Sequence, residues 1–305
     1  MSKDSGVEQV ESYKQAVEKN PDDAKVHYNL GNAYDNLFMY EEAIEAYKQA
    51  IRINPDYADA HDSLSIASDS LSMYKEQVES YKQAIKLNPD DAEAHYNLGY
   101  TYYELGMDKE AIESYKQAIK LNPDYADAHF YLGQVYGYLC MYEEAIEAYK
   151  QAIRVNPDFA AVHKILGNAY HKSGMNNEAI EAYKQTIRID PDDAEAHYNL
   201  GNAYDNLDMD KKAIESFKQA IRINPDYADA LANLGSAYDS LGMHKEAIEA
   251  FKQVISIEPD FAFAHYNLGL NYNVLNDRGS ALERYKILKS LDSELANELF
   301  NLIYK

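Results

Sequence analysis

Apolar residues along the chain recur at spacings of three and four, and this helical pattern stops and restarts at regular intervals. Near the start of the chain, Leu30 and Tyr34 fall on one helical face, and Ala43 and Tyr47 do so after a break at residues 38 and 39. No run of β-branched residues alternates polar with apolar positions. The pattern predicts an all-α chain in which each segment folds into two short antiparallel helices.

The proline positions show that one segment is repeated. Proline cannot donate a backbone hydrogen bond and disfavours helix at the residue before it, so each proline marks a helix boundary. All eight prolines lie 34 residues apart: Pro21, Pro55, Pro89, Pro123, Pro157, Pro191, Pro225 and Pro259. Eight whole repeats then span residues 24–295, with first residues Ala24, Ala58, Ala92, Ala126, Ala160, Ala194, Ala228 and Ala262.

Repeat two departs from the others at three core places. Ser65 replaces glycine, Ser68 replaces tyrosine and Gln77 replaces alanine. The bulk lost on one helix is partly returned by the other, and such exchanges cost roughly 1.5 kcal/mol or less when the volumes match. We expect a softer joint at this repeat and faster hydrogen exchange in residues 58–91 than in repeats three or six.

Charge and composition limit the classes of partner. The net charge of −22 disfavours nucleic acid and anionic membranes, which both require clustered Lys and Arg. The single cysteine, Cys140, permits no intrachain disulfide, and no apolar stretch is long enough to span a membrane. The first ten residues have no signal-peptide core. We therefore expect a cytoplasmic protein.

Eight residues of repeat six resemble the tetratricopeptide repeat family: His197, Leu200, Gly201, Tyr204, Ala213, Phe217, Ala220 and Pro225. The resemblance extends in phase over about nine-tenths of the chain. It implies an α-solenoid, a right-handed superhelix of antiparallel helix pairs whose first helices line a concave groove. Gly201 and Ala213 are small enough to let two helices approach closely.

Histidine stands at the fourth place of seven repeats, where the family usually has tryptophan: His27, His61, His95, His129, His163, His197 and His265. Successive repeats lie about 10 Å or more apart, whereas ligands to one metal ion converge within a few ångströms. The array therefore predicts packing between helices, with no metal and no cofactor.

The resemblance also implies which side chains face the groove. The 48 concave positions hold 11 acids, Asp205 and Asp239 among them, and three lysines, a net charge of −8. This excess predicts a cationic peptide as the ligand. The alternative is that the acids only keep the chain soluble.

Asparagine recurs at the sixth place as Asn29, Asn97, Asn199, Asn233 and Asn267. With Asn168 at the ninth place it looks like the asparagine ladder of O-GlcNAc transferases, which implies binding to the backbone of an extended peptide. Lys164, Asn168 and Asn199 also match the start of the carboxylate clamp of heat-shock cochaperones. The next repeat has Asp229 and Asn233 where that clamp needs cations, which argues against recognition of a C-terminal carboxylate.

Repeats three and four carry aromatic residues on the same face. Tyr96, Tyr100 and Tyr103 share one side of a helix, and Phe130 and Tyr131 follow on the next first helix. Such clusters anchor protein interfaces, so we expect a contact site for a partner here. Chance clustering competes with this interpretation, because the chain has 29 tyrosines.

The two ends of the chain match complementary halves of a repeat. Residues 7–19 match a second helix alone, and residues 294–305 match the start of a first helix. Pairing between molecules could complete a repeat and give end-to-end self-association. We favour the alternative, in which residues 294–305 form a capping helix and residues 7–19 are the remainder of a truncated repeat.

No arrangement typical of a catalytic site is present. We therefore expect no enzyme, but a protein–protein interaction scaffold that binds an extended, basic or aromatic-containing peptide segment in its groove. One alternative is the repeat module of a glycosyltransferase-like enzyme without its catalytic domain. The other is a scaffold that self-assembles through its terminal half repeats.

Overall fold

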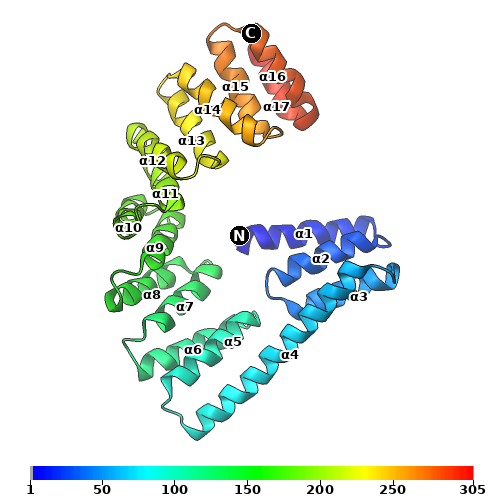
Figure 1. The fold of residues 1–305 in the computed structure, drawn as a ribbon, viewed down its shortest axis with the longest axis vertical. Helices are drawn as coiled ribbons and strands as arrows, with labels where there is room; N and C mark the ends of the chain where they lie inside the picture. The colour runs from blue at the N-terminus through cyan, green and yellow to red at the C-terminus, as the bar shows by residue number, and fades with distance from the viewer. Residues whose placement is uncertain (1–2, 305) are drawn as a thin grey trace. The chain divides into compact units, whose positions relative to one another are not determined.

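The chain is entirely helical wherever its structure is described. The computed structural model describes residues 3–304, which hold seventeen α-helices and no strand (Figure 1). The helices are α1 (Lys3–Lys19), α2 (Ala24–Asp35), α3 (Tyr40–Ile53), α4 (Ala58–Leu87), α5 (Ala92–Glu104), α6 (Asp108–Leu121), α7 (Ala126–Tyr138), α8 (Tyr142–Val155), α9 (Ala160–Lys172), α10 (Asn176–Ile189), α11 (Ala194–Asp205), α12 (Asp210–Ile223), α13 (Ala228–Ser240), α14 (His244–Ile257), α15 (Ala262–Val274), α16 (Arg278–Leu291) and α17 (Ser293–Ile303).

The helices form two compact parts, residues 1–157 and 158–305. Within each part, helices that are adjacent in sequence pack against one another, and each new pair stacks on the last (Figure 1). No layer encloses a single central core. This is the α-solenoid that the repeat pattern predicts, and that prediction is confirmed.

The turn between the first (A) and second (B) helix of a repeat requires one left-handed residue. Seven such residues, 34 or 68 apart, have φ between 53° and 74°: Phe38, Gly106, Cys140, Gly174, Asp208, Gly242 and Asn276. Glycine adopts this conformation without strain and holds three of the seven places, and Asp208 and Asn276 tolerate it better than most residues. Phe38 and Cys140 adopt it at a steric cost. Cys140 belongs to this series, as its alignment with glycines suggests.

Close approach of the two helices explains the glycine at the eighth place. A Cβ atom added to Gly201 would lie 2.5 Å from the ring of Phe217, which is fully buried on the facing helix. The expected close approach at Gly201 is therefore confirmed. Aromatic rings on the B helices pack in the same way in five sister repeats: Tyr47, Tyr115, Tyr149, Tyr183 and Phe251.

Histidines tie the first helix of six repeats to the loop before it. Nε2 of His197 donates to the carbonyl oxygen of Pro191 at 3.2 Å, and Nε2 of His265 donates to that of Pro259 at 2.8 Å. His27, His61, His95 and His129 make the same bond to the proline six residues earlier. The array is thus a set of local hydrogen bonds, which the sequence pattern identified only as packing.

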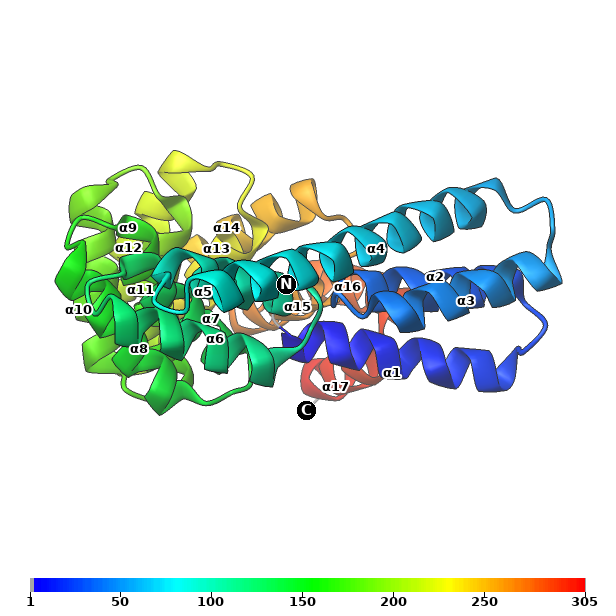
Figure 2. The same cartoon turned by 90° about the horizontal axis from the view of Figure 1, so that it is seen from below.

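Repeat two does not form a helix pair, and the expectation that it would is wrong. Residues 58–87 form the single 30-residue helix α4, which begins beside α3 and ends beside α5 (Figure 2). Ser72, at the place of the left-handed turn residues, stays helical. This change exposes core side chains of the repeat to solvent. Tyr81 and Ala84 are half-buried, whereas their counterparts Tyr47 and Ala50 are fully buried.

Steric conflict between Ser65 and Tyr81 accounts for the straight helix. At the sister glycines facing a B-helix ring, an added Cβ would lie only 2.4–2.9 Å from that ring, and Ser65 carries a Cβ while Tyr81 keeps its ring. Gln77 adds bulk where its counterparts are fully buried alanines. The atoms added at Ser65 and Gln77 do not fill the space that the smaller Ser68 leaves, because they lie at different points of contact between the two helices.

The long helix changes how repeats one and three meet. The residues that follow α2 meet the C-terminal end of α5 beside the middle of α4, where the ring of Phe38 lies 6.2 Å from that of Tyr103. The ring of Tyr74, near the centre of α4, lies 6.0 Å from that of Tyr40 in a tilted arrangement, and the Tyr74 hydroxyl donates to Glu104 at 3.3 Å. Repeats one and three are therefore in direct contact.

The two terminal helices cover the ends of the stacks. Val10 of α1 is buried in a cluster with Leu30 and Leu37, as a B helix packs on the next A helix. At the other end, Leu299 of α17 is fully buried in a cluster with Leu288. Leu299 lies against Gly269, the place that an aromatic ring occupies in the other repeats.

Candidate functional site

Two of the predicted asparagines form a hydrogen-bonded pair across neighbouring repeats in residues 158–305. Nδ2 of Asn199 on α11 donates to Oδ1 of Asn168 on α9 at 3.2 Å. The same oxygen accepts from the hydroxyl of Tyr183 at 2.8 Å. Tyr183, which the sequence analysis did not place in the site, thus fixes the orientation of the Asn168 amide.

The next repeat contains a second pair of the same geometry. Nδ2 of Asn233 on α13 donates to Oδ1 of Asn202 on α11 at 2.8 Å and to the hydroxyl of Tyr198 at 3.3 Å. Both pairs join the ninth place of one repeat to the sixth place of the next. These four asparagines are therefore hydrogen-bonded in pairs.

Among the residues that the structure describes, each amide pair has one donor group and one acceptor to which no protein hydrogen bond is assigned. In the first pair these are the Asn168 amide N–H groups and the Asn199 carbonyl oxygen, and in the second they are those of Asn202 and Asn233. An amide has two donors and two acceptor lone pairs, and a peptide unit has one N–H and one C=O. A pair can therefore hydrogen-bond both groups of a peptide backbone without reading its sequence.

The predicted lysine of this site is already neutralised. Nζ of Lys164 lies 2.8 Å from Oε2 of Glu195, on the next repeat, and 3.0 Å from Oδ2 of Asp193, the N-cap residue of α11. Burial lowers the pKa of Lys164, but the hydrogen bonds that its ammonium group donates to these two carboxylates, together with their charge, outweigh burial and keep the pKa above its usual value. The ammonium group is thus a link between repeats, and a ligand would have to compete with both carboxylates for it.

The remaining predicted residues of this part differ in their surroundings. Asp239 accepts from Nδ1 of His244 at 3.0 Å, so its charge faces a titratable donor. Burial raises the pKa of Asp205, and the nearby Asp210 and Asp208 add to the shift. Asn267 donates to the carbonyl of Phe263 in its own helix at 2.9 Å, so it does not continue the paired ladder.

The aromatic residues of repeats three and four form one cluster in residues 1–157. Tyr131 of α7 lies at its centre, with ring centroids 5.5 Å from Tyr100, 5.9 Å from Tyr96 and 5.1 Å from Phe130. Tyr103 lies 6.5 Å from the same ring. The structure thus brings together all five aromatic residues predicted for a contact site, and we call them the tyrosine cluster.

Glu104 borders the tyrosine cluster, and a second carboxylate of the same part of the chain, Asp35, lies near Tyr40 and Tyr47. Burial raises the pKa of Tyr100 to about 12, and the adjacent Glu104 contributes through charge and a hydrogen bond. Asp35, at the end of α2, is half-buried, and burial raises the pKa of its carboxyl. Within the described part of the chain Asp35 has no ion-pair partner. A cationic side chain that contacted Asp35 would offset the cost of burying its charge.

Asn29 and Asn97, also in residues 1–157, are half-buried and stand apart from the paired amides of repeats five to seven. At the sixth place of repeat four the ladder is replaced by Tyr131. The amide ladder is therefore concentrated in one part of the chain and the aromatic surface in the other.

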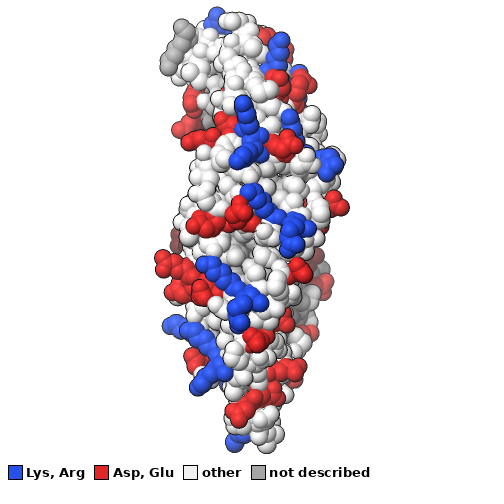
Figure 3. Space-filling model, turned by 90° about the vertical axis from the view of Figure 1, so that its left-hand side faces the viewer, with Lys and Arg blue, Asp and Glu red and all other residues white. Residues whose placement is uncertain are grey.

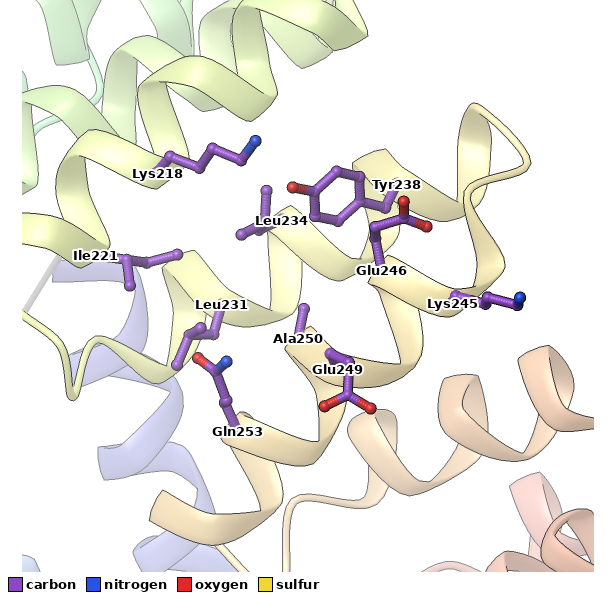
Figure 4. A pocket seen from close by; sticks show the side chains of 10 residues that line it. All are labelled: Lys218, Ile221, Leu231, Leu234, Tyr238, Lys245, Glu246, Glu249, Ala250 and Gln253. Atoms are coloured by element: carbon purple, nitrogen blue, oxygen red, sulfur yellow. The ribbon is translucent and has the colours of Figure 1, made fainter.

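An apolar hollow of about 380 Å³ in residues 158–305 was not anticipated from the sequence. It lies between α12, α13 and α14, with Leu231, Leu234 and Ile221 in its wall and Lys218 and Glu249 at its edge (Figure 4). Leu231 stands where the other seven repeats have histidine. That single exception to the histidine series was the available signal.

Surface charge is mixed on the face that Figure 3 shows, where Lys and Arg alternate with Asp and Glu and neither sign forms a continuous field. Several neighbours on the B helices pair locally, such as Glu181 with Lys184 at 2.7 Å. In residues 3–304 no helix is long and apolar enough to cross a membrane, and no group of three or more His, Cys, Asp or Glu is arranged to hold a metal ion.

Family models match most of the chain. A model described as "TPR repeat" matches residues 10–37, 72–106, 101–138, 141–174 and 167–208. A second, described as "Tetratricopeptide repeat", matches residues 24–57, 194–227 and 228–261. Neither matches residues 58–71, the first half of α4. No curated protein sequence matches the chain.

Solved structures of helical repeat proteins are similar to the chain. MamA is 35% identical with a TM-score of 0.52, over 54% of this chain and 97% of MamA. YrrB, described as a TPR protein with an unusual peptide-binding site, is 26% identical with a TM-score of 0.57, over 61% of this chain and 96% of YrrB. The C-terminal part of a TPR repeat-containing protein from Cytophaga hutchinsonii reaches a TM-score of 0.64 at 17% identity, over 76% of this chain and 98% of that one.

Proposed function

The chain belongs to the tetratricopeptide repeat family, and on that premise we propose that it is a non-enzymatic scaffold that binds an extended peptide segment of another protein. The paired amides carry the proposal. Asn168 with Asn199, and Asn202 with Asn233, repeat one geometry along successive A helices. A regular series of donors and acceptors suits a ligand whose own donors and acceptors repeat, and a peptide backbone has one N–H and one C=O in each peptide unit.

The chemistry of the side chains favours a peptide with basic or aromatic residues. Asp35 is half-buried without an ion pair in the described residues, and Glu104 borders the rings of the tyrosine cluster. Lys and Arg side chains interact favourably with both carboxylates and tyrosine faces. The similarity to YrrB, a TPR protein described as having an unusual peptide-binding site, supports the same class of ligand.

The terminal helices fit a capping role in this proposal. Apolar faces of α1 and α17 are buried against their neighbours, as terminal repeats of solenoids require. Self-association through the ends is then unnecessary to cover the last repeats.

Selection from a displayed library of random 12-residue peptides tests the proposal. We expect the intact chain to enrich peptides with Lys, Arg or aromatic residues, and the Asn168→Ala, Asn199→Ala and Asn233→Ala triple variant to bind them at least tenfold more weakly. Asn206→Ala, at the exposed end of α11, is the matched control and should bind as the unchanged protein does.

The tyrosine cluster is tested with the same peptides. Tyr100→Ala and Phe130→Ala should weaken binding of the aromatic or basic peptides while the helical circular-dichroism signal is retained. If the selected peptides bind the asparagine and aromatic variants as tightly as the unchanged protein, the proposed groove site is wrong.

A further inference from the structure

One side of α4 exposes a row of large apolar side chains. Leu87 is 88% exposed, Ile66 64% and Met73 46%. These residues and the exposed Ser80 follow each other at intervals of seven along the helix. Residues seven apart on a straight helix lie along one line, so Ile66, Met73 and Leu87 form a single stripe. We call it the α4 stripe.

The exposure of Leu87 follows from the single-helix form of repeat two. The counterparts of Leu87, such as Leu121 and Ile189, are half-buried at the ends of their B helices. Ser70, Gln77 and Ala84 lie beside the stripe at spacings of four and three, and all three are only half-buried. Alternating spacings of three and four are the pattern by which one helix receives another.

A row of acids runs beside the α4 stripe. Asp62, Asp69 and Glu76 are exposed, and they too lie seven residues apart. Asp62 and Asp69 each precede a stripe residue by four, so the row lies along one flank of the stripe. None of the three has an ion pair within residues 3–304, whereas Lys75 and Lys82 of the same helix pair with Glu41 and Glu79.

We propose that the α4 stripe and its acidic row bind an amphipathic helix of another protein that carries basic residues beside its apolar face. The exposed apolar residues of the α4 stripe contact the apolar face of the partner helix, and the unpaired carboxylates beside the stripe select for Lys or Arg next to that face. This site uses none of the asparagines or tyrosines of the proposed peptide site.

The spacing and the charge exclude other occupants. The stripe repeats about every 10.5 Å, the length of seven helical residues, whereas side chains on one face of an extended peptide repeat about every 6.7 Å. A second copy of α4 would bring the same acidic row, and its Lys75 and Lys82 already pair with Glu41 and Glu79. Like charges along a seam oppose pairing, so a basic helix fits better than a second copy.

Fluorescence anisotropy with a defined probe tests the proposal on the full chain. The probe is a labelled 18-residue helical peptide with Leu every three and four positions and Lys at its polar places; a second peptide has Glu in place of Lys. We expect the Lys peptide to bind at least tenfold more tightly than the Glu peptide. The Asp62→Asn, Asp69→Asn and Glu76→Gln triple variant, and separately Ile66→Ser with Leu87→Ser, should each weaken it about tenfold.

A charge-matched control separates the site from the general negative charge of the chain. Glu144→Gln, Glu215→Gln and Asp226→Asn remove three exposed acids outside α4 and should change the affinity less than threefold. Hydrogen exchange should slow in residues 62–87 when the probe is bound. Equal loss of affinity in the control, protection elsewhere, or a mass of twice the chain that Ile66→Ser with Leu87→Ser reduces to one chain would overturn the proposal.

Discussion

Ser65 and Tyr81 lie sixteen residues apart on one continuous helix, about 24 Å along its axis, although their counterparts in other repeats touch. Gly31 and Tyr47 hold those places in repeat one, where the ring leaves no space for a Cβ. A steric clash of about one methylene group thus accompanies the loss of the helix pair in repeat two.

Removing that conflict should restore the pair. Ser65→Gly, Ser72→Gly and Gln77→Ala together recreate the close approach, the turn residue and the small interface residue of the sister repeats. Spin labels on Ala58→Cys and Lys86→Cys, in a Cys140→Gly background, measure the result. We expect their separation to fall from about 42 Å along the helix to near the distance of about 10 Å between packed helices.

The control for this experiment adds the same residues at other places of α4. Ser63→Gly, Ser80→Gly and Gln83→Ala introduce two glycines and one alanine without relieving the contact with Tyr81. We expect this variant to keep the long distance. A short distance in the control would mean that flexibility of α4, and not the Ser65 contact, decides its shape.

Gly201→Ala should destabilise the C-terminal part by about 1–3 kcal/mol, because the added Cβ would lie 2.5 Å from the Phe217 ring. Urea unfolding followed by circular dichroism measures the change. Gly279→Ala is the matched control: its added Cβ meets nothing closer than 3.7 Å, and alanine favours the helix. Equal effects of the two changes would remove the steric explanation.

Asp35→Asn should stabilise residues 1–157 at pH 7. Burial raises the pKa of Asp35 in the folded state, so folding favours its protonated form and loses stability as pH rises through that pKa. The advantage of asparagine should therefore shrink as the pH falls through the raised pKa of the folded state and be absent below about 4, the pKa of the unfolded state. Unfolding curves at a series of pH values measure it.

Asp277→Asn should show the opposite trend. Hydrogen bonds from Ser280 lower the pKa of Asp277 at the start of α16, so its contribution is present above the unfolded pKa and is lost as pH falls through the folded one. The substitution should destabilise the chain at pH 7 and lose its effect in acid. The same sign of pH dependence for both variants would contradict these assignments.

Hydrogen exchange should be faster in residues 58–91 than in repeats three or six. Tyr81, Ala84 and Gln77 are half-buried in α4, whereas the counterparts Tyr115, Ala118 and Ala111 of repeat three are fully buried. Fewer buried contacts lower the cost of local opening. Mass-spectrometric exchange at peptide resolution measures the rates, and uniform protection over these repeats would refute the prediction.

The sequence predicted the regular repeats well because proline, glycine and the B-helix aromatic each serve one geometric purpose in every copy. It also identified the asparagines and the five aromatic residues that the structure brings together. It missed the pairing of the asparagines, since the Tyr183 and Tyr198 hydroxyls that hold them come from other places of the repeat. It also missed α4, because residue volumes were compared without the positions of the contacts.

The long helix also reverses the direction of the A helices that follow it in residues 1–157. A helix pair returns the chain to the end from which it started, but α4 leaves it at the opposite end, so α5 runs against the direction of α2. An extended ligand has an N-to-C direction of its own. A peptide bound in one direction by repeat three would therefore run in the opposite direction relative to repeat one. One extended strand would then meet Asn29 and Asn97 in opposite orientations.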